Sequence, residues 1–354
     1  METLLAPARS SGALCRKKDS QVISDISKLR ALHDISKNFA LEGDQLESLK
    51  SQLSREDQSA IDRFLSGFEI EDWFEAIFGI MPWTRLLHGL SQRQVPTQSK
   101  TNFQVPDFYA VIETSTLTFE PLLIEVKRVT GGKQSLKLRK SQVTPTKAYA
   151  DVLGIPLVYA IYWDSLGAWT LNTIDSFENK SSTFKISNSA AFEFDCSLIF
   201  GDVCYLITQQ LRRSQTFTTL APVESLHVIH DSFGRLISDE IDVDGKSTSL
   251  SGVQPAILDA MLGFTETSVT KDGPRTNIRS TIHDNFLFRL SAWITRYLGL
   301  CKIAPTEPYT NAAAHEIIRL MEQIGIPQKL MYPTGRTDEL AKLDSRFLHP
   351  KDAI

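Results

Sequence analysis

The stretch VPDFYAVIETSTLTFEPLLIEVKR, residues 105–128, decides the fold prediction. It holds two runs rich in β-branched and aromatic residues, separated by polar turn-forming residues, as is typical of neighbouring strands. Two later runs, IPLVYAIYW and AWTLNTI, have the same strand-like composition. Between the first two runs and these lies KLRKSQVTPTKAYADVLG, which suits a helix that starts near Pro145 and ends at Gly154. A strand, helix, strand order with this crossover length predicts a parallel strand pair inside an α/β core.

Working outward on the N-terminal side, FEIEDWFEAIFGIM places apolar residues on one helical face, and Pro82 provides a stop. Two more amphipathic stretches lie upstream, so residues 1–66 are predicted to be an N-terminal helical segment. On the C-terminal side, AFEFDCSLIF alternates like a further strand. We therefore expect an α/β core over residues 67–213, with a mixed β-sheet flanked by helices.

A new pattern starts near Ser214, where LHVIH and RLISDEI flank DSFG as in a hairpin, and another turn lies at 242–246. Three helical candidates follow: Val253–Leu262, Ile282–Leu298 and Ala312–Ile324. Residues 214–332 are thus predicted to be a smaller α+β domain. Residues 333–354 are predicted to be a polar, loosely held tail.

Composition excludes several classes of protein. The 354 residues carry 38 Lys and Arg against 42 Asp and Glu, so an anionic partner must be met by a local basic patch rather than by net charge. The longest apolar run, Ile155–Trp163, is far shorter than the ~20 residues of a membrane span. Four scattered cysteines suggest neither a disulfide framework nor a zinc site, and the order of apolar and basic residues at the N-terminus is not that of a secretory signal. We expect a cytoplasmic protein without membrane contact.

Side chains alternate across a strand, so Glu125 and Lys127 share one face of the second run while Val126 points to the other. If the strand that begins after Asp107 is its hairpin neighbour, a second carboxylate reaches the same spot. Two carboxylates and the backbone carbonyl of Val126 suit Mg²⁺, and a nearby ammonium suits phosphodiester hydrolysis. The alternative is a Glu and a Lys that alternate by chance on a solvent-exposed face.

Through Pro106, Asp107, Glu125 and Lys127, the sequence resembles the PD-(D/E)xK nuclease superfamily, which has the restriction-endonuclease-like fold. Archaeal Holliday junction resolvases and Mrr-type restriction nucleases look most similar, over roughly residues 67–175. The resemblance implies an endonuclease that uses Mg²⁺ or Mn²⁺, with Asp107 and Glu125 holding the metal and Lys127 positioning the nucleophile. It further implies DNA as substrate, action as a homodimer or with a partner protein that directs cleavage, and a role in restriction, antiviral defence or mobile-element processing.

Members of that superfamily usually carry another acid on the first helix, and the candidates here are Glu71 and Glu75. At ~100° per residue, Glu71 lies roughly 75° from the centre of the apolar face, Glu75 roughly 115°, and Asp72 on the far side. Glu71 is preferred on this ground. Glu75 stays an alternative, because the Phe74-Glu75 pair looks like the first-helix pattern of some restriction nucleases.

Residues 126–150 contain seven basic residues and no acidic one. This local excess predicts a loop and helix that grip backbone phosphates, and a solvated helix face is the alternative. The residues predicted to bind nucleic acid are Arg128, Lys133, Lys137, Arg139, Lys140 and Gln142. Two functions other than DNA cleavage remain open: a non-catalytic nucleic-acid-binding or assembly module, and an RNA nuclease.

Overall fold

The computed structural model describes residues 69–92, 99, 101–114, 119–220, 229–282, 285–301 and 307–347. Residues 71–354 make up one compact unit. The predicted N-terminal helical segment, 1–66, lies outside the described residues. None of the helices in the described ranges is both long enough and apolar enough to cross a membrane.

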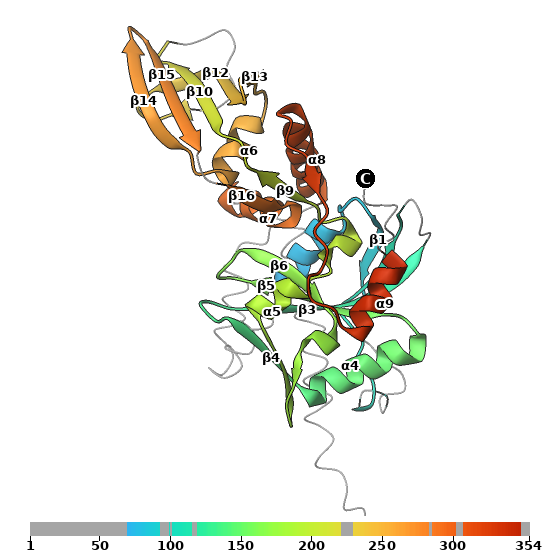
Figure 1. The fold of residues 1–354 in the computed structure, drawn as a ribbon. Helices are drawn as coiled ribbons and strands as arrows, with labels where there is room; N and C mark the ends of the chain where they lie inside the picture. The colour runs from blue at the N-terminus through green and yellow to red at the C-terminus, as the bar shows by residue number, and fades with distance from the viewer. Residues whose placement is uncertain are drawn as a thin grey trace, which may run out of the picture. The chain divides into compact units, whose positions relative to one another are not determined.

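A five-stranded mixed sheet lies at the centre of the predicted core, with strand order β1-β2-β3-β5-β6 (Figure 1). Its strands are β1 (Thr84–Gly89), β2 (Phe108–Ile112), β3 (Glu120–Val129), β5 (Leu157–Trp163) and β6 (Ala168–Asn172). The β3–β5 pair is parallel, and the other three pairs are antiparallel. The crossover between β3 and β5 carries β4 (Ser135–Arg139) and helix α4 (Lys140–Leu153). The predicted α/β class, with a mixed β-sheet flanked by helices, is confirmed.

Helices cover both faces of this sheet. Residues 69–78 are helical, and the ring of Phe74 packs 5.5 Å from the rings of Phe108 and Trp169. On the opposite face, Val143 of α4 belongs to a buried cluster with Tyr159 and other residues of β5. Because side chains alternate along each strand, the two helices pack against alternate residues of β3 and β5.

Helix α4 ends where the sequence predicts, at Gly154, whose φ of 66° lies in the left-handed region that glycine adopts freely. It begins at Lys140, earlier than predicted, and Pro145 lies inside the helix. The first turn is closed by Gln142, whose Oε1 accepts a hydrogen bond from the Arg139 backbone N–H at 3.3 Å. Side-chain capping therefore sets the start of the helix, rather than the proline.

The strand predicted over AFEFDCSLIF is wrong. Residues 188–200 form helix α5 (Asn188–Glu193) and the 3₁₀ helix η3 (Ser197–Phe200). Ser187 caps α5 by accepting a hydrogen bond from the Ala190 N–H at 3.2 Å. Asp195 then accepts from the backbone of Leu171 at 2.6 Å and of Ser197 at 3.2 Å, so a buried side chain takes the place of a strand partner. Before α5, the chain forms η2 (Ile174–Ser176), β7 (Glu178–Asn179) and β8 (Thr183–Ser187), and β8 pairs with β4.

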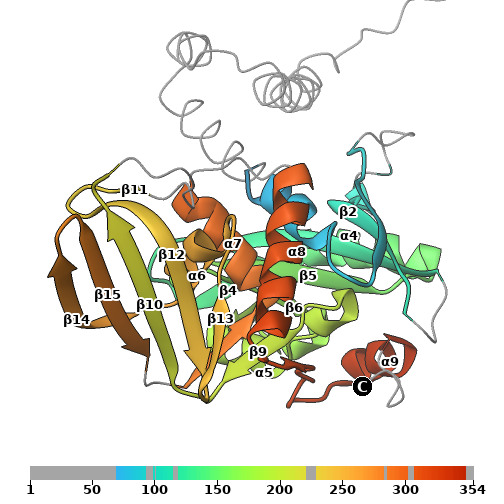
Figure 2. The same cartoon turned by 90° about the horizontal axis from the view of Figure 1, so that it is seen from above.

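The following residues form two further sheets and three helices. A larger sheet has the order β11-β12-β10-β15-β14, with β13 paired to β12 (Figure 2). Its strands are β10 (Leu211–Thr218), β11 (Ile229–His230), β12 (Gly234–Val243), β13 (Lys246–Ser249), β14 (Thr265–Asp272) and β15 (Arg275–Ile282). The smaller sheet joins β9 (Cys204–Ile207) to β16 (Phe286–Arg289) and β17 (Gln328–Lys329), and the helices are α6 (Gln254–Met261), α7 (Leu290–Cys301) and α8 (Glu307–Gln323).

Most local predictions for this part agree with the structure. The hairpin around DSFG and the turn after Val243 both form, as β11–β12 and β12–β13, while residues 221–228 lie outside the described ranges. Strand β10 runs through the predicted boundary at 213/214. The helix predicted from Ile282 is wrong in its first part, because residues 286–289 pair with β9 and α7 begins only at Leu290.

The tail predicted to be loosely held contains helix α9 (Asp338–Phe347). Leu340 and Leu343 are buried, and the Glu339 N–H donates to Asp175 Oδ2 of η2 at 2.8 Å. The polar character of the segment was read correctly, but two leucines at helical spacing suffice to anchor it.

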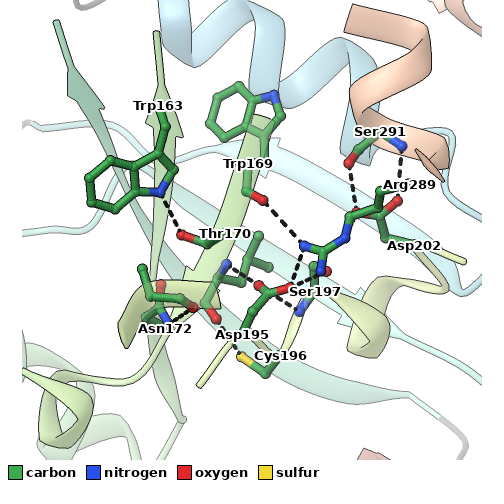
Figure 3. A network of polar contacts seen from close by, with 12 residues as sticks. Trp163, Trp169, Thr170, Asn172, Asp195, Cys196, Ser197, Asp202, Arg289 and Ser291 are labelled. Atoms are coloured by element: carbon green, nitrogen blue, oxygen red, sulfur yellow. Dashed lines mark hydrogen bonds and ion pairs between the residues drawn. The ribbon is translucent and has the colours of Figure 1, made fainter. Parts of the chain in front are cut away.

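Buried acids join β6 and η3 to the start of α7 (Figure 3). Arg289 contacts the carboxylate of Asp195 and donates to the Trp169 carbonyl at 3.3 Å. Asp202 accepts from the Ser291 N–H at 2.9 Å and from its hydroxyl at 2.6 Å. Burial raises the pKa of Asp202 to about 6, although Arg289 and Ser291 act in the other direction.

This shift predicts a pH-dependent stability. The folded-state pKa of Asp202 lies above its ordinary value. The contribution of Asp202 to the free energy of unfolding is therefore complete below pH ~4 and is lost as the pH rises through about 6. Asp202→Asn cannot ionise, and its free energy of unfolding relative to wild type should rise by about 3 kcal/mol between pH 4 and pH 7.5. Urea titrations over this range measure it, with the exposed Asp231→Asn as control. A flat difference would contradict the shift.

Candidate active site

The site begins where β2 and β3 separate. Their ladder ends at the pair Phe108–Ile124, and the next donor on that edge of β3, the Val126 N–H, is taken by Asp107 Oδ2 at 2.7 Å. The backbone of Asp107 is held in turn, because its carbonyl accepts from the Leu90 N–H at 2.8 Å. The side chain of Asp107 thus takes the hydrogen bond that a further backbone carbonyl of β2 would accept. This bond holds the carboxylate of Asp107 beside β3.

Glu125 and Lys127 lie on the face of β3 that α4 covers, because Glu125 pairs in register with Tyr159 of the buried α4 cluster. Lys127 Nζ donates to Glu125 Oε1 at 2.6 Å and to the Val126 carbonyl at 2.9 Å. Glu125 is only 5% exposed, and its Oε2 atom is buried without a hydrogen-bond partner among the residues that the structure describes. One carboxylate oxygen is thus neutralised and the other is left available.

The charges of the site act on one another strongly. Burial, and then the charge of Glu125, raise the pKa of Asp107 well above its usual range, against the opposing effects of Lys127 and the Val126 N–H. Burial alone would lower the pKa of Lys127, but Glu125, Asp107 and Glu71 raise it above its ordinary value. One ammonium therefore faces three carboxylates when all are ionised.

Of the two acids on the first helix, Glu71 acts on this cluster. Its charge contributes to the raised pKa of both Asp107 and Lys127. Glu75 is half-buried and is not among the principal charges that shift either group. Asp72, predicted on the far side of the helix, is instead 5% exposed, so the buried face of the helix is broader than the apolar spacing indicates.

Glu71→Gln is expected to reduce metal-dependent cleavage by ~10–100-fold, the usual effect of losing a supporting group at a metal site. Glu75→Gln should stay within about threefold of wild type, because its charge is not a principal influence on Asp107 or Lys127. Single-turnover rates at one fixed Mg²⁺ concentration measure the difference. The reverse ranking would assign the role to Glu75.

The donor set fits a divalent cation that keeps part of its water shell. Within the described ranges, no three Asp, Glu, His or Cys side chains gather into a ready-made metal site. Mg²⁺ is commonly held by one or two carboxylates together with water and substrate oxygens. Asp107 and the unpartnered Glu125 Oε2 supply such a pair, whereas the predicted third ligand, the Val126 carbonyl, accepts a hydrogen bond from Lys127.

The basic residues predicted to bind nucleic acid have different environments. Arg128 is paired with Asp164 at 2.8 Å, and Asp164 also accepts from the Gly131 N–H at 3.3 Å, so Arg128 fastens the loop after β3. Lys133, Lys137, Arg139 and Gln142 are exposed, and Lys140 is partly buried. Outside this set, Lys147 pairs with Asp151 at 3.1 Å and with Glu339 of α9 at 3.3 Å.

One basic residue of this surface was missed. Lys185 of β8 lies directly opposite Lys137 of β4, and like charges in opposed positions cost free energy unless something compensates them. Glu178, on the other side of Lys185, pairs with Lys180 at 3.2 Å. No local sequence signal reveals that β8 pairs with β4. We call Lys133, Lys137, Arg139, Lys140 and Lys185 the basic ribbon.

Comparison with known proteins adds little. No protein-family model matches the chain, and no curated protein matches it. Among solved structures, it is similar to Hjc, a Holliday junction resolvase from the archaeal hyperthermophile Archaeoglobus fulgidus, with 19% sequence identity and a TM-score of 0.25. That similarity covers 34% of this chain and 88% of the resolvase.

Proposed function

We propose that this protein is a divalent-metal-dependent DNA endonuclease that hydrolyses phosphodiester bonds. The observation that carries the proposal is the convergence of Asp107, Glu125 and Lys127 at the point where β2 and β3 separate, with Glu125 Oε2 buried and unpartnered. A buried carboxylate oxygen without a partner is costly, and a bound cation would satisfy it.

Each residue has a distinct role in this proposal. Asp107 and Glu125 hold the Mg²⁺ or Mn²⁺ ion, and Glu71 adds negative charge near them. Lys127, kept protonated by these acids, orients the attacking water and stabilises the charge that develops on the phosphate. The bound ion, for its part, would polarise the phosphoryl group and favour ionisation of the attacking water.

The basic ribbon is proposed to hold the DNA backbone. Its members flank the α4 face of the sheet, the face to which Glu125 and Lys127 belong. Such contacts position a duplex without reading its sequence. A single site cuts one strand at a time, so double-strand cleavage would need a second copy of the chain or a partner protein.

The direct test incubates the purified full chain with duplex, branched and single-stranded DNA and with RNA, in Mg²⁺, in Mn²⁺ and with chelator. We expect DNA cleavage that requires the metal and is absent in Glu125→Gln. Cleavage of RNA alone would assign the site to an RNA nuclease. Metal-independent binding, with every substrate left intact, would favour a non-catalytic module.

Binding is tested separately from chemistry in a Glu125→Ala background. Replacing Lys133, Lys137, Arg139 and Lys140 by Ala should flatten the slope of log affinity against log salt by about two to four units, since each phosphate contact contributes about 0.9. Adding Lys185→Ala should flatten it further. The measurement is a duplex titration at several salt concentrations without Mg²⁺.

The matched control removes four exposed basic residues elsewhere: Arg235, Lys246, Lys271 and Arg275. It changes the net charge equally and should leave the slope nearly unchanged. If both quadruple variants flatten the slope to the same extent, the basic ribbon has no special role.

A further inference from the structure

Two buried polar atoms without partners belong to neighbouring strands. Glu125 Oε2 on β3 and the Tyr159 hydroxyl on β5 are both buried and accept or donate no hydrogen bond within the described part of the chain. Tyr159 is 1% exposed. Unsatisfied buried polar groups are rare, because each loses its bonds to water on folding.

These two atoms lie on the same side of the sheet. The parallel register pairs Glu125 directly with Tyr159, so both side chains rise from the face that α4 covers. The tyrosine ring is fixed in place by the buried α4 cluster, including an edge contact with Phe177 at a centroid distance of 5.7 Å. The hydroxyl is buried together with the ring.

The charge of Glu125 also acts on Tyr159. Burial, and then the negative charge of Glu125, raise the pKa of Tyr159 above its ordinary value. The phenol thus stays protonated at physiological pH and keeps a hydrogen to donate. A donor without an acceptor and an acceptor without a donor thus project from two residues that are paired in register, and no direct bond joins them.

We propose that Tyr159 is a positioning residue for Glu125, acting through one buried water that joins the Tyr159 hydroxyl to Glu125 Oε2. The tyrosine O–H donates to the water, and the water donates one hydrogen to the carboxylate. Buried waters of this kind usually satisfy polar groups that lack protein partners. The inference rests on the proposed function only in treating Glu125 as a metal ligand.

The consequence is a carboxylate held from both ends. Lys127 fixes Oε1 at 2.6 Å, and the water fixes Oε2. A carboxylate oxygen has two lone pairs, so Oε2 can accept from the water and still bind a cation. Orienting groups behind a metal ligand typically account for 10–100-fold in metal affinity.

Tyr159→Phe removes only the hydroxyl and tests the inference. Thermal unfolding of the full chain is followed without DNA across a series of Mg²⁺ and Mn²⁺ concentrations. We expect the metal concentration for half-maximal stabilisation to rise about tenfold. The metal-free melting temperature should fall by no more than about 5 °C, because the change removes one hydrogen bond to the proposed water and none to a protein group within the described ranges. Cleavage at saturating metal should stay near wild type, with the same shift in metal requirement.

Tyr162→Phe is the matched control, since Tyr162 is on β5 but contacts Trp169, on the opposite face of the sheet from Tyr159. Its metal titration should follow that of wild type. An unchanged midpoint in Tyr159→Phe, with wild-type metal binding intact, would overturn the role of Tyr159 and leave the proposed function standing. Absence of any metal response in wild type would overturn both.

Discussion

Glu125→Gln and Lys127→Ala should each reduce metal-dependent cleavage by at least ~10³-fold while moving stability in opposite directions. Both remove groups proposed to act on the reacting phosphate or its metal, whose contributions amount to several kcal/mol. Glu125→Gln removes a buried negative charge near Asp107, whose pKa is raised first by burial and then by the charge of Glu125. Its melting temperature without metal should therefore equal or exceed that of wild type.

Lys127→Ala leaves Asp107, Glu125 and Glu71 without their shared cation. We expect a loss of about 2 kcal/mol in the free energy of unfolding, less than the ~3–5 kcal/mol of a fully buried pair because the Lys127 side chain is 29% exposed. Cleavage assays and urea titrations on both variants provide the measurements. Lys246→Ala, at an exposed position of β13, is the control. Mg²⁺-dependent cleavage by folded Lys127→Ala would refute the assignment.

The largest effect on stability is expected from Arg289→Met. Arg289 contacts Asp195 and lies 4.0 Å from Asp202, and the side chains of these acids are 3% and 0% exposed. Without the guanidinium, two buried carboxylates lack their cation, and such losses typically cost about 3–5 kcal/mol. Burial already raises the pKa of Asp202 in the presence of Arg289. Without Arg289, the ionised carboxylate of Asp202 would be destabilised further.

Chemical unfolding at pH 7.5 measures this cost. Arg212→Met is a suitable control, because Arg212 is exposed and its guanidinium bonds only to Gln210 at 2.8 Å and 3.2 Å among the contacts seen. It should change the free energy of unfolding by less than about 0.5 kcal/mol. A similarly small change in Arg289→Met would contradict the stabilising role given to Arg289 in the network of Figure 3.

Features encoded locally were predictable from the sequence. Alternation along IPLVYAIYW and PLLIEVKRV predicted β5 and β3, and it put Glu125 and Lys127 on one face, as the structure has them. The prediction assumed that the strand after Asp107 is the hairpin neighbour of β3, and in the structure this pairing brings Asp107 to Val126. These steps needed only strand periodicity and turn chemistry.

Features that depend on distant partners were not predictable. AFEFDCSLIF alternates like a strand, but Asp195 bonds to the backbone of β6 and Arg289 arrives from far along the chain. The pairing of Lys185 with Lys137 and the docking of α9 depend on tertiary contacts in the same way. The burial of Glu125 was also missed, because a charged residue that alternates along a strand suggests a wet cleft rather than a covered face.

The parallel register of β3 against β5 has a consequence for the living cell. Glu125 and Tyr159 pair across β3 and β5, and the whole of β4 and α4 lies between them in the sequence. The chain emerging from the ribosome therefore carries the carboxylates of Asp107 and Glu125 before β5 has been made. A slip of one residue would turn Glu125 and Lys127 to the wrong side. A nascent or misfolded copy therefore lacks the assembled cluster, because Glu125 gains its neighbour Tyr159 only after synthesis has passed β5.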